Sequence, residues 1–219
     1  MKIKKTIYLN AGHFGQGSSG DPGARGNGLV EREEAIKIRD LLVPLLRKHF
    51  YVFVVPDCKN LKQSVASVNE VAKKLNDGIA LSLHLNAGGG TGAECFYHRR
   101  AIITGKKQAT ILMDRYHKTT GLANRGARPD TQSVDRYLYW IHKTNPWALL
   151  LEMCFIDNQK DTLYFKNNRG RIAEAIYLGI CDIYKIKVEN KIELKNKISQ
   201  YLDSIVQALS GIRNLIKQI

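Results

Sequence analysis

The sequence predicts one α/β domain built on a largely parallel sheet, followed by a helical C-terminal appendage. Three observations carry this prediction. Short apolar segments alternate with amphipathic helical segments along most of the chain, a pattern typical of βαβ units. A chain of 219 residues, 44% of them hydrophobic, is long enough for one such domain with its own core plus a small appendage. After Tyr184 the sequence becomes lysine-rich and then strongly periodic.

The predicted strands are short, rich in β-branched and aromatic residues, and bounded by turn or charge signals. Four of them are expected to be buried, and a fifth is a further candidate. In chain order they comprise residues 4–10, 50–55, 78–87, 93–99 (the further candidate) and 147–156.

Helices are predicted between and after these strands. Residues 29–50 carry apolar side chains at approximately helical spacing, although Pro44 is expected to kink this helix or to lie at a break. Residues 61–77 form a clear amphipathic helical pattern. Residues 106–122 predict another helix, and residues 171–184 predict one that closes the domain.

The last segment, Lys187–Ile219, predicts a helix with a heptad seam. Its apolar residues are spaced alternately four and three apart, and they are Ile198, Leu202, Ile205, Leu209, Ile212, Ile216 and Ile219. A seam of this length is near the lower limit for a helix that self-associates. Two roles are therefore equally favoured. The seam forms a homo-oligomer, or the helix docks on the chain's own domain.

The net charge is +14, from 34 basic and 20 acidic residues spread along the chain. Such an excess favours a polyanionic partner. Nucleic acid is one candidate and the anionic polymers of a bacterial cell wall are another, and charge alone does not choose between them. The sequence has no recognisable helix-turn-helix or aromatic RNA-binding platform, so nucleic acid is not the expected partner.

The N-terminal residues are basic but include no apolar stretch of signal-peptide length and no small-residue cleavage site. No later segment has the uninterrupted apolar length that spans a bilayer. We therefore expect a chain that is synthesised in the cytoplasm without a signal peptide and has no membrane partner. The four cysteines, Cys58, Cys95, Cys154 and Cys181, form no CxxC pair, so free and mostly buried thiols are expected.

Residues 15–20, Gly-Gln-Gly-Ser-Ser-Gly, fit the GxGxxG pattern of a dinucleotide-binding turn. That turn requires a helix directly after its third glycine, because the first amides of the helix bind the pyrophosphate. Here an irregular stretch, residues 21–28, follows instead. We therefore do not expect this loop to bind a phosphate.

Two histidines and a glutamate follow the ends of predicted strands or begin a predicted helix. His13 lies just past the first strand, His84 lies near the end of another strand, and Glu31 begins the first helix. Ligands bind at this edge of open parallel sheets, and two histidines with one carboxylate form an open ligand set for catalytic zinc. Each residue alone also has an ordinary structural explanation, so their shared location carries the hypothesis.

Glu152 interrupts the otherwise apolar segment Ala148–Phe155. An isolated carboxylate in a central strand is costly unless it faces a metal site or a partner, so a functional role is favoured. A glutamate near a zinc-bound water can take its proton and later deliver it to a leaving amine.

In order along the chain, these motifs resemble those of the zinc-dependent N-acetylmuramoyl-L-alanine amidases of the third amidase family. Residues 11–33, AGHFGQGSSGDPGARGNGLVERE, resemble the Gly-His opening, the Asp-Pro-Gly-Ala segment and the metal-binding glutamate of the family. SLHLNA, residues 82–87, is similar to its second histidine strand, and LLLEMCFIDNQKD, residues 149–161, to its strand with the catalytic glutamate. ANRGARPD, residues 123–130, is similar to a segment near the substrate cleft.

This resemblance covers residues 1–186 and implies a twisted, mostly parallel sheet flanked by helices on both faces. It implies that His13, Glu31 and His84 bind Zn²⁺ and that Glu152 is the catalytic glutamate. The implied reaction is hydrolysis of the amide bond between N-acetylmuramic acid and L-alanine in peptidoglycan. Peptidoglycan and anionic wall polymers are then the expected partners, and wall targeting becomes a third possible role for residues 187–219.

Two details of the ligand set stay open at this point. Glu33 and Glu34 lie close enough to Glu31 to replace it as the ligand, although the resemblance favours Glu31. Asn10 stands where an acidic residue is common in the family, so the support of the His13 ring is expected to differ.

The biological role also has alternatives. The expected lack of an export signal, together with the basic chain, suggests a phage-type cell-wall lysin that acts after release from the bacterial cytoplasm, and a bacterial autolysin is the alternative. Cys154 is two residues from Glu152 and is expected on the same side of the strand, which leaves a thiol nucleophile as another alternative. A peptidoglycan-binding protein with an inactive site is the last.

Overall fold

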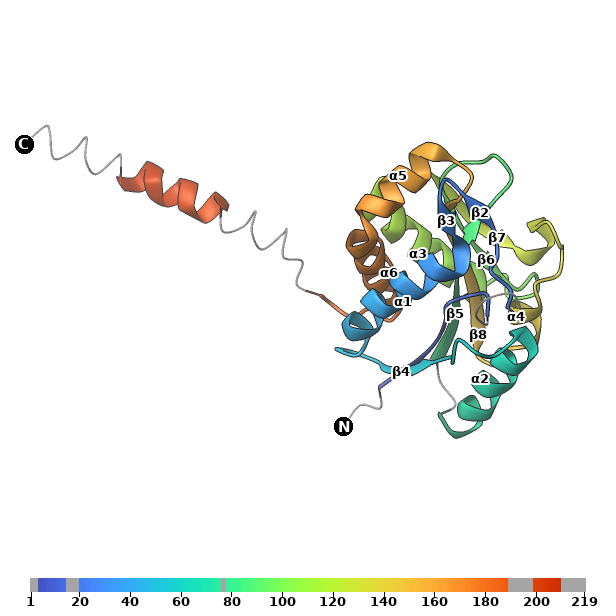
Figure 1. Ribbon diagram of the computed structural model, residues 1–219. Coiled ribbons are helices and arrows are strands. Elements are labelled where there is room, and N and C mark those ends of the chain that lie inside the picture. The colour runs from blue at the N-terminus through green and yellow to red at the C-terminus, as the bar shows by residue number, and fades with distance from the viewer. Residues whose placement is uncertain (1–3, 15–19, 76–77, 189–198, 210–219) are drawn as a thin grey trace, which may run out of the picture. The chain divides into compact units, whose positions relative to one another are not determined.

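The computed structural model describes residues 4–14, 20–75, 78–188 and 199–209. A six-stranded sheet with the order β4-β1-β5-β8-β6-β7 lies at the centre of the domain (Figure 1). Its strands are β1 (Thr6–Asn10), β4 (Tyr51–Val54), β5 (Gly78–Asn86), β6 (Ala93–Tyr97), β7 (Asn124–Pro129) and β8 (Trp147–Phe155). The short strands β2 (Arg25–Gly26) and β3 (Leu29–Val30) form a separate two-stranded sheet.

The sheet is parallel except where β6 meets β8. The chain passes from β5 to β6 through residues 87–92, which are too few for the crossover that a parallel neighbour requires. β6 therefore runs back antiparallel beside β8. The predicted α/β class and mostly parallel sheet are confirmed.

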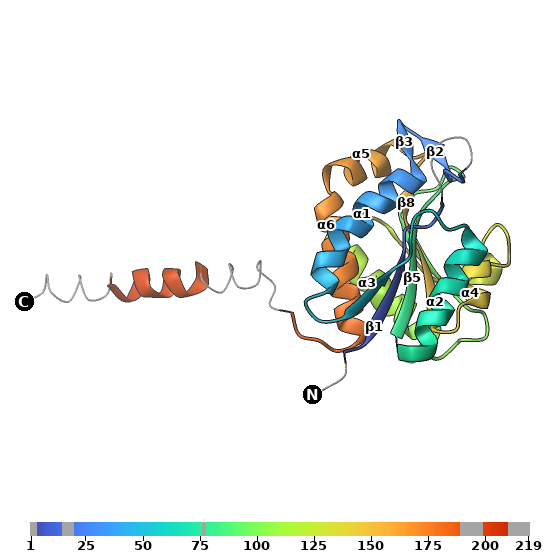
Figure 2. The same ribbon diagram turned by 60° about the horizontal axis from the view of Figure 1, so that its bottom comes forward.

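Helices cover both faces of the sheet (Figures 1 and 2). On one face lie α1, α3 and α6, with α6 packed against both α1 and α3, and on the other face lie α2 and α4. The bounds are α1 (Glu31–Leu46), α2 (Leu61–Leu75), α3 (Thr104–Thr120), η2 (a 3₁₀ turn, Asp130–Gln132), α4 (Tyr139–Lys143), α5 (Gln159–Asn167) and α6 (Arg169–Ile183). All five predicted strands and all four predicted domain helices are present, with ends that differ by a few residues. Pro44 lies in the last turn of α1, which ends two residues later.

β1 is enclosed by helices on both sides. Ile7, Tyr8 and Leu9 are all fully buried, so side chains that point to opposite faces are equally removed from water. On the α2 side, Tyr8 packs with Val68 and Trp140, and the Trp140 indole donates a hydrogen bond to the Leu149 carbonyl (3.2 Å). Burial of each such side chain contributes roughly 1.5–3 kcal/mol, so the sheet provides a rigid base for residues at its edge.

The loop after β5 is held by residues that follow β8. The Asp161 carboxylate accepts hydrogen bonds from the Thr91 hydroxyl (2.8 Å) and the backbone amides of Gly92 (2.8 Å) and Phe155 (3.1 Å). Asn158 donates to the Gly90 carbonyl (2.9 Å) and caps the start of α5. The two loops at this edge of the sheet are thus fixed to each other.

The chain divides into two compact units, residues 1–185 and 186–219. In the second unit residues 199–209 are helical, and they include Leu202, Ile205 and Leu209 of the heptad seam. The other seam residues, Ile198, Ile212, Ile216 and Ile219, lie outside the described residues. Oligomerisation, docking and wall targeting by residues 187–219 stay predictions. Within the described part of the chain, no helix combines the length and apolar character needed to cross a membrane.

Candidate active site

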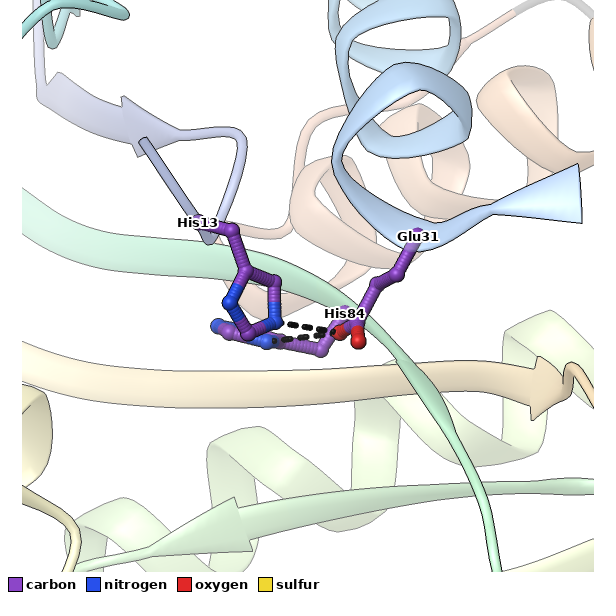
Figure 3. Close-up of side chains that lie close together, drawn as sticks. All are labelled: His13, Glu31 and His84. Carbon is purple, nitrogen blue, oxygen red and sulfur yellow. Dashed lines mark hydrogen bonds and ion pairs between the residues drawn. The ribbon is translucent and has the colours of Figure 1, made fainter. Parts of the chain in front are cut away.

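Three side chains that the sequence singles out converge at one edge of the sheet (Figure 3). His13 follows the C-terminal end of β1, His84 lies on β5, and Glu31 is the first residue of α1. One nitrogen of each histidine and one carboxylate oxygen of Glu31 all lie within 4.8 Å of one another. The structure therefore brings together a His-Glu-His set from three separate segments.

The Oε1 atom of Glu31 is the centre of this cluster. It lies 2.9 Å from Nε2 of His13 and 3.0 Å from Nδ1 of His84, as the dashed lines in Figure 3 mark, and it accepts a hydrogen bond from the Leu85 amide (3.0 Å). The other oxygen, Oε2, accepts from the Ala24 amide (2.8 Å). Glu31 is 4% exposed, so these donors compensate a carboxylate that has lost its water.

The outer nitrogen of each imidazole also has a partner. Nδ1 of His13 lies 2.8 Å from Oδ2 of Asp21, and Nε2 of His84 lies 2.9 Å from the Ser82 hydroxyl. Asn10 donates to that hydroxyl (3.1 Å), so it supports His84, while Asp21 supports His13. Such partners fix the orientation of a ligand ring. No sequence pattern marks Ser82 as a partner of His84, and the Asp-Pro-Gly-Ala segment does not by itself indicate that Asp21 contacts His13.

Two glycines make room for the cluster. A Cβ atom at Gly23 would lie 2.4 Å from the His13 ring and 2.5 Å from the Glu31 carboxylate, and one at Gly12 would lie 3.0 Å from the His84 ring. Both residues also have positive φ angles, 68° and 76°. The close packing of the three polar side chains therefore depends on glycine at both positions.

The cluster shifts the ionisation of its members. Burial alone would lower the pKa of His13, but its hydrogen bonds and charge interactions with Glu31 and Asp21 outweigh burial and raise it to about 9. Burial alone would raise the pKa of Glu31, but the hydrogen bonds from His13 and His84 hold it well below its usual range. The carboxylate is therefore ionised throughout the ordinary pH range.

The neighbouring glutamates do not enter the cluster. Glu34 is buried in ion pairs with Arg169 (2.6 Å) and Lys37 (2.8 Å), and Glu33 is exposed. Among the three glutamates at the start of α1, only Glu31 contacts the histidines. Glu34 therefore has a structural role in these ion pairs and is not part of the His-Glu-His cluster.

Glu152 lies on β8 in register with His84 on β5 and with Glu94 on β6. Side chains in register on neighbouring strands point to the same face of the sheet, so the three lie in one row across it. The Glu94 carboxylate is compensated by Arg125 (2.9 Å), Arg128 (3.0 Å) and the Asn86 amide (2.7 Å). The sequence alone did not predict that Glu94 lies beside Glu152, or that Arg125 and Arg128 of the 123–130 segment pair with Glu94.

One oxygen of the Glu152 carboxyl group lacks such hydrogen-bond partners in the described part of the chain. This oxygen, Oε2, is buried. Burial raises the pKa of Glu152 well above its usual value, and the negative charges of Glu31 and Glu94 raise it further. A partly buried carboxyl group that favours its protonated form and lines the same cavity as two histidines is suited to general acid–base chemistry.

Cys154 lacks the features of a nucleophile. It is fully buried, and burial, together with the charges of Asp161 and Glu152, raises the pKa of its thiol. A nucleophilic cysteine requires a lowered pKa and access to substrate. Cys95 and Cys181 are also free and buried, and Cys58 is free and exposed, as expected for mostly buried thiols.

A cavity of about 400 Å³ opens beside the cluster. His13, Glu31, His84 and Glu152 all line it, and another part of its wall is formed by Asp135 and residues 137–140, which lie just before α4 and in its first turn. The cavity can therefore hold a substrate against both the polar cluster and this wall.

The wall is fastened by a buried carboxylate. Asp130, which is fully buried, accepts hydrogen bonds from the Arg99 side chain (2.5 Å) and backbone amide (2.8 Å) and lies 2.6 Å from Nε2 of His142. Burial alone would raise the pKa of Asp130, but the contacts with Arg99 and His142 lower it to about 2. These three residues are far apart in sequence, and no local pattern predicted them.

A mostly parallel sheet that carries a converging His-Glu-His set beside a carboxyl group with a buried oxygen is typical of hydrolytic enzymes. The profile of the family described as N-acetylmuramoyl-L-alanine amidase matches residues 7–182, and the chain belongs to this family. Its members are hydrolases, so the expected enzyme class is confirmed.

Individual relatives agree with this assignment. The endolysin of Bacillus phage SPP1 is 28% identical over 198 residues, which cover 84% of this chain and 68% of the relative. The sporulation-specific N-acetylmuramoyl-L-alanine amidase of Bacillus subtilis (strain 168) is 30% identical over 166 residues, which cover 74% of this chain and 60% of the relative. The catalytic domain of the amidase CwlV from Bacillus (Paenibacillus) polymyxa var. colistinus superposes with a TM-score of 0.69 at 25% identity, covering 84% of this chain and 99% of that domain. The chain thus spans about two thirds of the length of the two sequence relatives.

The Asp130 carboxylate gives the first testable prediction. Because its pKa is lowered in the folded state, its contribution of roughly 2 kcal/mol to stability is present above about pH 4 and is lost as the pH falls toward 2. Asp130→Asn should lower the free energy of unfolding at neutral pH, and its difference from the wild type should shrink between pH 4 and 2. Urea unfolding at several pH values measures both.

The matched control is Asp114→Asn, which changes an exposed aspartate of α3. It is expected to alter stability by no more than about 0.5 kcal/mol. If the difference between Asp130→Asn and the wild type stays constant across this pH range, the titration is wrongly assigned.

Proposed function

We propose that this chain hydrolyses the amide bond between N-acetylmuramic acid and L-alanine in peptidoglycan, with Zn²⁺ bound by His13, Glu31 and His84. The observation that carries the proposal is the convergence of these three side chains beside the Glu152 carboxyl group, one buried oxygen of which has no hydrogen-bond partner among the described residues. Membership of the amidase family supports the reaction, and relatives named as amidases or endolysins support the substrate.

The donor set fits zinc. Two imidazole nitrogens and one carboxylate oxygen form a common open set for a catalytic zinc ion, which leaves a position for a water molecule or the substrate. Both histidines direct a nitrogen at the same oxygen of Glu31, and Asp21 and Ser82 hold the outer nitrogens, so the three donors already face one point. A zinc ion held there would supply Lewis acidity toward the scissile carbonyl.

Glu152 is proposed as the general base and then the general acid. It takes a proton from the attacking water, whose oxygen forms a bond to the carbonyl carbon of the muramic acid lactyl group. When the C–N bond breaks, Glu152 returns the proton to the amine nitrogen of L-alanine, which leaves a carboxylic acid on the sugar side. Burial and the nearby Glu94 favour the protonated carboxyl group that this second step requires.

The biological role proposed is that of a phage-type cell-wall lysin. Similarity to the endolysin of Bacillus phage SPP1 across 84% of the chain supports it. The net charge of +14 supports association with anionic wall polymers, which would hold the enzyme near its substrate. A bacterial autolysin has the same chemistry and is the alternative role.

Zinc binding tests the ligand set directly. Glu31→Ala should lower the affinity for zinc by at least about 100-fold, because it removes a ligand and the hydrogen-bond acceptor that orients both histidines. Competition with a chromophoric chelator measures the affinity. Glu33→Ala, two residues along the same helix and exposed, is the control and should bind zinc as the wild type does. Equal affinities for Glu31→Ala and the wild type would contradict the proposed site.

Glu152→Gln separates catalysis from metal binding. It should reduce the release of new L-alanine amino termini from purified peptidoglycan by roughly 10²–10⁴-fold, because it removes the group that moves the proton, and it should leave zinc affinity intact. Wild type stripped of metal should be inactive until zinc is restored. If metal removal makes no difference to the wild type, the His-Glu-His site is wrong and the Cys154 thiol must be reconsidered.

The lysin role is tested in living cells. Produced inside a Bacillus host, the chain should lyse the culture only when the membrane is permeabilised, and Glu152→Gln should not lyse it under either condition. Turbidity measures the outcome. Detection of the protein outside intact cells without a permeabilising partner would favour the autolysin alternative.

A further inference from the structure

The part of the cavity wall formed by residues 135 and 137–140 contains an aromatic residue that the proposed chemistry does not use. Tyr137 lines the cavity, yet its side chain is 45% exposed. Asp135 lines the same wall. A large aromatic residue left half open inside a reaction cavity is a candidate for contact with substrate.

One face of the Tyr137 ring is already covered. The ring stacks on the imidazole of His142, with centroids 4.1 Å apart and planes 21° from parallel. His142 in turn contacts His98, with ring centroids 4.4 Å apart. The stack leaves the other face of the ring uncovered by His142, in a side chain that lines the cavity and is 45% exposed.

The backbone also holds Tyr137 in place. The preceding residue, Arg136, has a left-handed conformation with φ of 53°, which is uncommon for a residue with a side chain. Its carbonyl accepts a hydrogen bond from the Arg99 guanidinium (2.5 Å), and Arg99 is bound to the buried Asp130 carboxylate. The same carboxylate holds His142. The Asp130 carboxylate thus holds both the backbone before Tyr137 and the imidazole on which its ring stacks. A left-handed residue such as Arg136 stores local strain, which is typical of functional sites.

We propose that Tyr137 is a platform on which a pyranose ring of the glycan strand stacks, on the sugar side of the scissile amide. This inference rests on the proposed function and adds a carbohydrate subsite to it. A pyranose has one face of C–H groups and a rim of hydroxyl groups, so it fits a flat aromatic ring with a single open face. The carboxylate of Asp135 can accept hydrogen bonds from the hydroxyl rim. An extended peptide offers no comparable flat apolar face.

The test compares two substrates that share the scissile amide. One is a disaccharide-peptide from peptidoglycan, and the other is a D-lactoyl-L-alanyl peptide, which keeps the amide but lacks the pyranose. Tyr137→Leu should raise KM for the disaccharide-peptide by roughly 2- to 10-fold, the range that an aromatic contact supplies, and leave KM for the lactoyl peptide unchanged. Tyr137→Phe, which keeps the ring, should retain the wild-type KM for both.

The matched control is Tyr51→Leu, which alters a tyrosine that is 53% exposed at the start of β4. Tyr51 pairs with Thr6 at the N-terminal end of β1, whereas His13 follows the C-terminal end of that strand. The control substitution should change neither KM. If Tyr137→Leu raised KM equally for both substrates, the wall would contact the peptide or serve a structural role. If it changed KM for neither substrate, the ring would not contact the substrate. Both results overturn the proposal.

A binding measurement keeps this test separate from the proposed reaction. Calorimetric titration of the full chain carrying Glu152→Gln, with and without Tyr137→Leu, should show the same 2- to 10-fold difference in Kd for the disaccharide-peptide only. If the wild type cleaves neither substrate in the presence of zinc, the proposed function fails while the titration still decides the role of Tyr137.

Discussion

The site depends on a single buried oxygen, Oε1 of Glu31. It contacts His13 and His84 and accepts from the amide of Leu85, so it joins the loop after β1, the strand β5 and the first turn of α1. The second oxygen adds the loop at Ala24. A carboxylate so far from water is tolerated only with this many donors. The need to compensate one charge therefore determines how three chain segments meet, and the candidate ligands are placed as a consequence.

The sequence predicted the parts of this site that follow from strand direction. Parallel strands end at one edge of a sheet, so His13 and His84, near the ends of two strands, were expected to be neighbours. Glu152 was conspicuous because it interrupts an apolar strand. The contacts that orient these residues could not be predicted in the same way, because Ser82 follows no pattern, and Arg99 and His142 reach Asp130 from distant positions through tertiary packing.

The antiparallel strand β6 explains how two carboxyl groups on one row of the sheet come to have different surroundings. The short loop after β5 forces β6 to return beside β8, which places Glu94 opposite Glu152. Arg125 and Arg128 compensate Glu94, while the described residues provide no partner for the buried oxygen of Glu152. Glu94 and Glu31 then add to the effect of burial in raising the pKa of Glu152. The environment of each group, rather than its residue type, separates a structural carboxylate from a candidate acid–base group.

Buried carboxylates that hold irregular backbone recur around the cavity. Glu31, Asp130 and Asp161 are all buried carboxylates, and each fixes an irregular segment by accepting a hydrogen bond from a backbone amide, at Ala24, Arg99 and Gly92 respectively. Irregular backbone cannot satisfy its own donors, so an acceptor supplied from elsewhere sets its shape. The polar cluster stays on the rigid sheet edge, while the wall that carries Tyr137 is shaped by its own anchor. Changes in that wall can therefore alter which substrate is held without moving the groups that act on the amide bond.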